Sequence, residues 1–343
     1  MSPASNTVRA ISSGAGPALL AAVLFGASTP LAKLLLRGMD PWMLAGVLYL
    51  GSGLGLEALR IVTAAGSRSR IEPRTWLRLG AAIVAGGVVA PVLLMTGLAR
   101  SQASTAALLL NLEGVFTVLL ARFVLREHVS RRITVGMASI VAGGVALTVG
   151  GHAMAGGWLG PAAIAAACLG WAIDSNLTRQ VSAMDPVSLA MFKGGAAGAT
   201  NVVIARWLGS AWPGPGTLAA AGLVGFLGYG ISLVLFVVAL RGIGVARTAA
   251  YFSLVPFFGS AIAVLLLRDP ITPSLVVAGV LMAMGLWLNL TEYHEHVHEH
   301  FELPQESGRA SGHEPQPPRD RRDREPVWHS HPHYPDIHHR HDH

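Results

Sequence analysis

Hydrophobic residues fall in ten blocks along the chain, and short segments rich in Arg, Pro and Gly separate these blocks. A helix that crosses a bilayer needs about 20 mainly apolar residues, and the blocks are close to that length. The pattern therefore predicts an all-α, polytopic membrane protein with ten transmembrane helices. The predicted helices cover residues 17–37, 41–63, 75–97, 102–125, 132–150, 158–180, 187–208, 217–240, 246–267 and 272–291.

The second half of the chain repeats the first. Residues Leu98–Ser130 return as Leu240–Thr272, at an offset of 142 positions. The identical pairs are Leu98/Leu240, Ala107/Ala249, Leu112/Leu254, Phe116/Phe258, Ala121/Ala263, Leu125/Leu267 and Arg126/Arg268. Five helices per copy is an odd number, so the second copy enters the membrane from the opposite side, and we expect two inverted five-helix repeats. The chain then divides into an N-terminal segment 1–15, repeats 16–150 and 158–291, and a tail 292–343.

The distribution of charge predicts how the protein lies in the membrane. Charged residues make up 13% of the chain, against about 25% in soluble domains. The predicted loops and helix ends carry 12 arginines on the side of the N-terminus and 4 on the other side. Because basic loops stay inside, both termini are expected in the cytoplasm. An Arg count of 23 against 2 Lys is typical of a GC-rich bacterial genome, which indicates the bacterial inner membrane.

Basic residues that orient a membrane protein are no sign of a nucleic-acid partner, and none is expected. The expected partners are the lipid bilayer and a small-molecule substrate, with protons, divalent metal and a second copy in a homodimer left open. The one cysteine, Cys168, lies inside an apolar block, so an intrachain disulfide is excluded.

The tail holds 12 of the 14 histidines and is expected to lack a fixed structure without a ligand. Imidazole is a common ligand of Zn, Ni and Cu, so the tail is a candidate binder of Zn, Ni or Co. The candidate ligands are His294, His296, His298, His300, His329, His331, His333, His338, His339, His341 and His343. If the last helix continues into the tail, His294 and His298 share one helical face, as do His296 and His300.

The repeated signature consists of small residues, an L-x-P-x-F-type helix, then R-[ED] and a short turn. It resembles the EamA-type transporters of the drug/metabolite transporter superfamily over residues 16–291. The resemblance implies a transporter that moves small metabolites, mostly outward, by alternating access, with no required cofactor and no enzymatic reaction. The first copy departs from the pattern, because Gly114 stands where the second copy has Pro256, and Glu113 precedes it.

Polar residues at membrane depth are costly, so each marks a candidate site. Glu113 lies near the middle of its predicted helix, and Asn111 precedes it by two positions. At the offset of 142, Asn111 corresponds to Ser253, and the repeat mate of Glu113 lies in the same stretch, between Tyr251 and Pro256. Inverted symmetry places both stretches at similar depth, which predicts a substrate or proton site there. The alternative is a neutral Glu113 that only holds helices together.

A second candidate lies closer to the cytoplasmic edge. Asp174 and Lys193 are each six residues from the inner ends of neighbouring helices, and Asn176 is close by. At 1.5 Å per residue both lie about 9 Å inside the same edge, so they can pair. The pair is interpreted either as a structural ion pair or as a gate.

Together these features predict a secondary transporter that exports a small polar or amphipathic metabolite, with proton coupling as an option and a regulatory, metal-binding tail. The alternative is a divalent-metal (Zn, Co or Ni) transporter that uses the tail to capture or sense its cargo. His294-Glu295-His296-Val297-His298 matches the H-E-x-x-H pattern of zinc proteases. Alternating His and Glu produce that match by chance, and no protease domain surrounds it.

Overall fold

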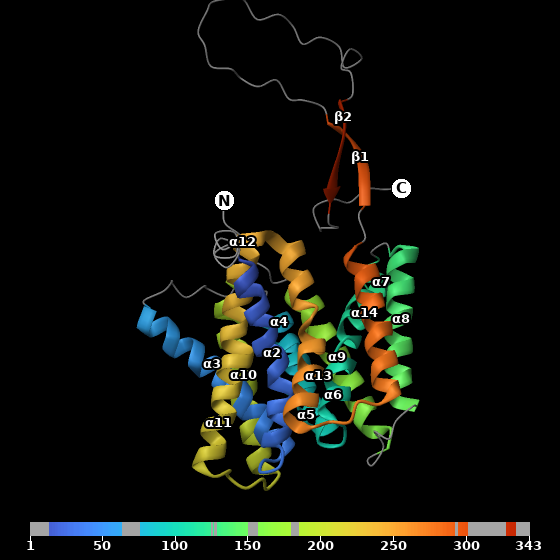
Figure 1. The fold of residues 1–343 in the computed structure, drawn as a ribbon. Helices are drawn as coiled ribbons and strands as arrows, with labels where there is room; N and C mark the ends of the chain where they lie inside the picture. The colour runs from blue at the N-terminus through green and yellow to red at the C-terminus, as the bar shows by residue number, and fades with distance from the viewer. Residues whose placement is uncertain are drawn as a thin grey trace, which may run out of the picture. The chain divides into compact units, whose positions relative to one another are not determined.

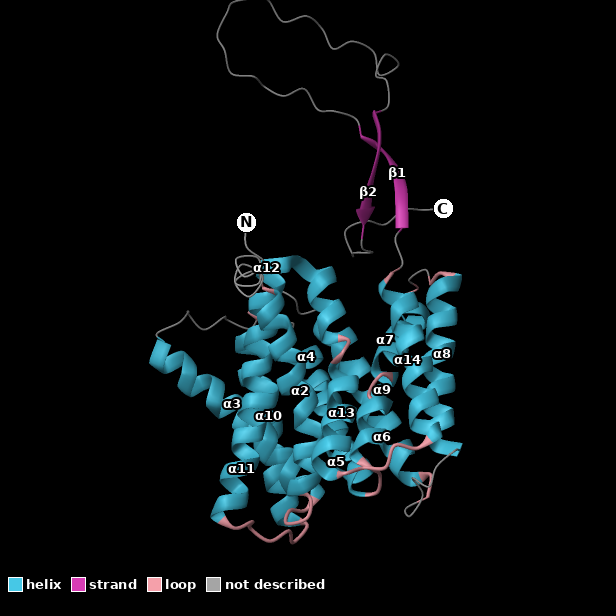
Figure 2. Cartoon of the chain, viewed as in Figure 1, coloured by secondary structure: helices cyan, strands magenta, loops and turns pink. Residues whose placement is uncertain are grey.

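The computed structural model describes two units of the chain (Figures 1 and 2). Unit 1 spans Met1–Leu290 and unit 2 spans Thr291–His343. The described residues are 14–63, 76–124, 126, 129–130, 131–149, 157–179 and 185–291, with the backbone of 294–300 and 327–333.

Unit 1 consists of helices. The first half contains α2 (Ala15–Leu35), α3 (Pro41–Thr63), α4 (Trp76–Ala82), the π-helix η2 (Ile83–Val89), α5 (Ala90–Ala99), α6 (Ala103–Leu109), α7 (Leu112–Val124) and α8 (Arg131–Val149). The second half contains α9 (Leu159–Arg179), α10 (Pro186–Trp207), α11 (Pro215–Gly225), the π-helix η3 (Phe226–Ile231), α12 (Ser232–Phe252), α13 (Val255–Leu267) and α14 (Pro273–Leu290).

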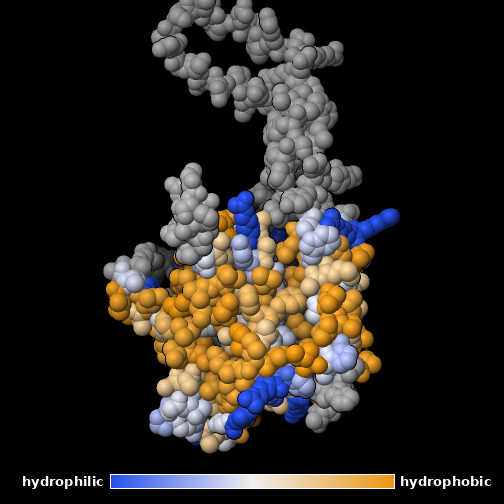
Figure 3. Space-filling model, viewed as in Figure 1, coloured by the Kyte–Doolittle hydropathy of each residue, from blue (hydrophilic) through white to orange (hydrophobic). Residues whose placement is uncertain are grey.

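Eight helical stretches among the described residues are long and apolar enough to cross a membrane. On the face of unit 1 that Figure 3 shows, hydrophobic residues cover the middle, and hydrophilic ones lie toward the two ends. The prediction of a polytopic membrane protein is therefore confirmed. Pro215–Phe252 forms one continuous stretch in this count, although Gly244 leaves the helical conformation with a φ of 80°.

Two helix boundaries differ from the sequence prediction. The helix predicted at 102–125 is broken at Leu110–Asn111, which separates α6 from α7. The helix predicted to begin at 246 is broken at Ser253–Leu254, and α13 begins just before Pro256. Proline lacks an N–H group and fits the first turn of a helix, which explains why a new helix starts there. Both breaks fall at the depth where the sequence predicts a site.

The two halves share their irregularities as well as their sequence. The π-helices η2 and η3 fall at repeat-equivalent positions, since the offset of 142 carries residues 83–89 onto 225–231. Arg126 and Arg268, an identical pair of the repeat, both have a positive φ, of 58° and 55°. No other non-glycine residue of the described backbone has a positive φ. The repeated sequence therefore specifies the same local deviations twice.

Close helix contacts in unit 1 depend on small residues. A methyl group on Gly53 of α3 would meet the backbone of Gly194 and Gly195 in α10. One on Gly136 of α8 would meet the Gly285 carbonyl of α14. Since hydrophobic burial adds little between helices in lipid, such backbone contacts are a main source of attraction.

Unit 2 corrects a prediction for the tail. Its described backbone forms β1 (His294–His300) and β2 (Val327–His333), which pair antiparallel. The sequence predicted either no fixed structure or a continued helix at 294–300. His alternates there with Glu and Val, and again with Ser and Pro in β2. This period of two matches a strand, and a helix needs a period of 3.6.

Candidate functional site

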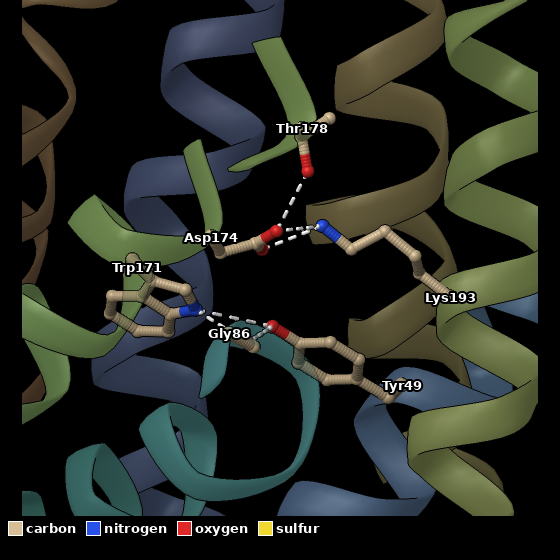
Figure 4. Close-up of polar contacts among 6 residues, drawn as sticks. All are labelled: Tyr49, Gly86, Trp171, Asp174, Thr178 and Lys193. Carbon is tan, nitrogen blue, oxygen red and sulfur yellow. Dashed lines mark hydrogen bonds and ion pairs between the residues drawn. The ribbon is translucent and has the colours of Figure 1, made fainter. Parts of the chain in front are cut away.

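The most polar group of contacts inside unit 1 lies where α9, α10, α3 and η2 meet (Figure 4). The Lys193 Nζ atom of α10 donates to both carboxylate oxygens of Asp174 in α9, at 2.5 and 2.6 Å. The Thr178 hydroxyl, one turn further along α9, donates to Asp174 Oδ1 at 2.9 Å. The Asp174 and Lys193 side chains are only 12% and 16% exposed. The structure thus pairs the two charges that the sequence places at similar depth.

The π-helix η2 supplies a carbonyl to the same group. The Gly86 carbonyl accepts hydrogen bonds from the Tyr49 hydroxyl at 3.0 Å and from Trp171 Nε1 at 2.9 Å. In the π-helix the Ala90 N–H donates to the Ala85 carbonyl, and Pro91, which is next in line for the Gly86 carbonyl, has no N–H group. The Gly86 carbonyl is therefore open to side-chain donors. A methyl group on Gly86 would overlap the Asp174 carboxylate, so this position needs glycine. Sequence reasoning missed Tyr49, Trp171 and Thr178.

Glu113 lies in the first turn of α7, directly after the break at Leu110–Asn111. Its side chain is half-buried, and its carboxyl makes no hydrogen bond to any residue that the structure describes. The carboxyl is close enough to Asp174 and to Tyr49 to interact with both electrostatically. Glu113 therefore has no hydrogen-bond or ion-pair partner among the described residues, and it interacts electrostatically with the acid of the buried ion pair.

Side chains of neighbouring residues contact the backbone at the helix break beside Glu113. The Cys168 thiol of α9 lies 3.7 Å from the Leu109 carbonyl, which the break leaves without its helical donor. The Asn111 amide donates to the Leu108 carbonyl at 2.9 Å and contacts Met282 Sδ of α14 at 3.6 Å. Asn111 is thus engaged in holding the break, and the Glu113 carboxyl has no hydrogen bond within the part of the chain that the structure describes.

The matching break in the second half has a different polar content. Ser253 donates to the Ala250 carbonyl of its own helix at 2.8 Å, Tyr251 is half-buried, and Pro256 is buried. Within the described residues, no hydrogen bond joins Tyr251 or Ser253 to Glu113. Asn176 of α9 donates to the Ala172 carbonyl, at 2.9 Å, and does not contact the ion pair through a hydrogen bond.

A row of aromatic side chains begins at Tyr49 and leads away from the ion pair. The ring centroids of Tyr49 and Tyr229 are 5.7 Å apart, and those of Tyr229 and Phe25 are 5.5 Å apart. Phe252 follows at 5.5 Å from Phe25, and Phe236 at 4.8 Å from Phe252. All five side chains are half-buried. They come from α2, α3, η3 and α12, so no periodicity in the sequence could have revealed the row.

Polar contacts also join helix ends on the side of unit 1 where α5 ends and α6 begins. The Lys33 Nζ atom donates to the Leu98 carbonyl at 2.6 Å and to the Ala99 carbonyl at 3.1 Å. The Asp269 carboxylate accepts bonds from the backbone N–H and the hydroxyl of Ser104, at 2.8 and 2.9 Å. Asp269 lies at the N-terminus of α6 and Lys33 at the C-terminus of α5, so each charge interacts favourably with the dipole of that helix.

Of the candidate metal ligands in the tail, His338, His339, His341 and His343 lie outside the described residues. The others belong to β1 and β2. Within the described helices of unit 1, no group of three or more His, Cys, Asp or Glu is arranged to hold a metal ion.

A bundle of apolar helices with a buried ion pair, a free carboxyl and two broken helices is the architecture of a membrane transporter. The model of the EamA-like transporter family matches residues 12–149 and again residues 158–291. The chain therefore belongs to the EamA-like transporter family.

The proteins similar to the chain include a curated transporter and a solved structure. An uncharacterized transporter of Methanothermobacter thermautotrophicus is 28% identical over 291 residues, which cover 79% of this chain and 84% of that protein. A crystal structure matches with a TM-score of 0.60 at 20% identity, over 80% of this chain and 95% of that one. At this identity the structural match supports the fold alone.

Proposed function

We propose that this membrane transporter is a secondary transporter that exports a small polar or amphipathic metabolite by alternating access. The observation that carries the proposal is Glu113, a carboxyl at a helix break that has no hydrogen-bond partner among the described residues. A polar group at membrane depth costs free energy, so one without a structural partner is a candidate for binding substrate or a proton. The half-buried aromatic row beside Tyr49 offers surface for the apolar part of an amphipathic solute.

The proposed architecture is ten crossings in two inverted repeats of five. Eight stretches meet the length and composition criteria for a span. α9 would add another crossing, and the departure of Gly244 from helical geometry would divide Pro215–Phe252 so that α13 completes a further one. Several features that recur in the two halves support the repeat. They are the π-helices, the helix breaks and the positive φ of Arg126 and Arg268. Five crossings per half would give the halves opposite orientation.

In the proposed cycle the two groups of polar contacts act as gates. Asp174 and Lys193 would hold α9 against α10 on the cytoplasmic side, and Lys33 and Asp269 would hold helix ends together on the other side. Glu113 would exchange a proton as its surroundings alternate. The tail would bind Zn, Ni or Co and regulate transport. The chain contains no histidine in the described helices, which disfavours the alternative of a metal path through them.

The test is transport by purified protein in liposomes, with a metabolite panel and a divalent-metal panel on opposite sides of a pH gradient. Glu113→Gln is expected to abolish proton-driven transport and to leave the amount of protein in the membrane near normal. Glu57→Gln is the matched control, because Glu57 pairs with Arg60 at 2.6 Å one turn away on α3, and it should leave transport unchanged. Wild-type transport by Glu113→Gln between pH 6 and pH 8 would remove Glu113 from the site.

A further inference from the structure

The hairpin of unit 2 places histidine opposite histidine three times. In the register of β1 and β2, His294 pairs with His333, His296 with His331, and His298 with His329. Residues at positions i and i+2 of a strand lie on the same face, and directly opposed residues share that face. The three pairs therefore form a ladder of six histidines on one face of the hairpin. The sequence alone contains the histidines but not this pairing.

The residues between the histidines belong to the other face. The pairs there are Glu295 with Pro332, Val297 with Ser330, and Glu299 with Trp328. His300, the remaining histidine of β1, pairs with Val327. The register thus separates histidine from every other residue type over three consecutive pairs of one face.

The spacing of the ladder suits metal coordination. The Cβ atoms of opposed residues in an antiparallel pair are about 4.5–5.5 Å apart. Residues two apart on one strand are separated by about 7 Å. Imidazole binds Zn²⁺ with a metal–nitrogen distance of about 2.0–2.1 Å, and closed zinc sites are tetrahedral with four ligands. Two neighbouring pairs of the register place four histidines at adjacent positions on one face of the hairpin, which is the number of ligands that a closed zinc site needs.

We propose that this ladder is a binding site for a divalent transition metal such as Zn²⁺, Ni²⁺ or Co²⁺. Its centre is the His296/His331 pair. That pair belongs to both possible sets of four, with His294/His333 on one side and with His298/His329 on the other. The site therefore depends on the central pair more than on either end pair.

Metal binding would also explain why this segment forms a hairpin. A two-stranded hairpin is marginally stable by itself in water. Pro332 removes one possible backbone donor from β2. Metal ions that bind only the paired arrangement stabilise it by their binding free energy. The site deepens the regulatory part of the proposed function, since it specifies which histidines of the tail act together, and it does not depend on the transport path.

The experiment uses the full chain, purified in detergent, with three variants that each lose two histidines. His296→Ala/His331→Ala removes the central pair, and His294→Ala/His333→Ala removes an end pair. His339→Ala/His341→Ala removes two histidines outside the strands. Zn²⁺ affinity is measured by competition with a chromophoric chelator, and hydrogen exchange of residues 294–300 and 327–333 is followed with and without Zn²⁺.

The central-pair variant is expected to lose the tightest Zn²⁺ site and the Zn²⁺-dependent protection of both strands. The end-pair and outside variants are expected to keep both. Equal weakening in all three variants would mean that affinity follows the number of histidines, and the ladder would be wrong. The ladder would also be wrong if Zn²⁺ binds without protecting the two strands. Transport in zinc-free liposomes should be unchanged in all three variants, so failure of the ladder and failure of the proposed transport function are separate results.

Discussion

At the scale of single residues, the decisive feature is the buried pair of Asp174 and Lys193. Their Coulombic attraction must offset the loss of hydration of both charges, and the extra hydrogen bond from Thr178 helps to do so. A buried pair of this kind contributes little net stability relative to two apolar side chains. Removing one partner lowers the free energy of unfolding strongly, however, because the other charge then stays buried without compensation.

We therefore expect Lys193→Met to destabilise the protein by about 3–5 kcal/mol. Asp174→Asn should also destabilise it, because Lys193 is then the uncompensated charge. The double variant Asp174→Asn/Lys193→Met should recover most of the lost stability, and it should still fail in transport if the pair is a gate. Cys168 is buried and is the one cysteine of the chain, so a thiol-reactive dye reports unfolding on heating.

A structural role and a gating role give different results in this set. Recovery of both stability and transport in the double variant would show that the pair serves packing alone. Lys193→Met that melts like the wild type would show that the charge of Asp174 is compensated elsewhere.

At the scale of elements, the π-helix η2 determines how the pair meets its surroundings. It turns the Gly86 carbonyl toward Tyr49 and Trp171, and it brings the Gly86 Cα against Asp174. Its counterpart η3 carries Tyr229, the second ring of the aromatic row. Each π-helix thus positions a different part of the candidate site, one polar and one aromatic.

Gly86→Ala is expected to disrupt the site, because the added methyl group would overlap the Asp174 carboxylate, and either the ion pair or the η2 backbone must move. Gly80→Ala is the control, since nothing lies within 4 Å of a methyl group added there, in α4 of the same helical stretch. The melting temperature and the transport rate should both fall for Gly86→Ala and stay near the wild-type values for Gly80→Ala. Equal melting temperatures and transport rates in the two variants would mean that α9 can shift without loss of stability. The close contact between Gly86 and Asp174 would then not matter for transport.

At the scale of the whole molecule, α2 begins and α14 ends at the same edge of unit 1 (Figure 1). An even number of crossings is required for this arrangement. The excess of arginine, 12 against 4, predicts that this edge faces the cytoplasm. The short segment after α13, which contains Arg268 and Asp269, would then face the opposite side.

A reporter enzyme that is active only in the cytoplasm should be active when fused after residue 291. The same reporter inserted between Arg268 and Asp269 should be inactive, and a periplasmic reporter should give the opposite pattern at both positions. Equal activity at the two positions would exclude a membrane crossing by α14. Periplasmic activity after residue 291 would invert the topology.

The sequence by itself determined the membrane class, the repeat and the positions of the candidate residues along their predicted helices. These follow from hydrophobic length and from identical residues at a fixed offset, which are local or periodic properties. It also placed Asp174 and Lys193 at equal depth, because the rise per residue of a helix is fixed. The family match to both halves agrees with the resemblance seen in the repeated motif.

Only the tertiary structure decided which side chains surround those residues. Tyr49, Gly86 and Trp171 come from three separate helices, and their contacts depend on how those helices pack. The sequence likewise could not show that Asn111 holds the break while Glu113 has no hydrogen-bond partner among the described residues. In the tail, a shift of one residue between two strands would move every histidine pair apart. Register is a property of pairing between distant segments, and composition does not contain it.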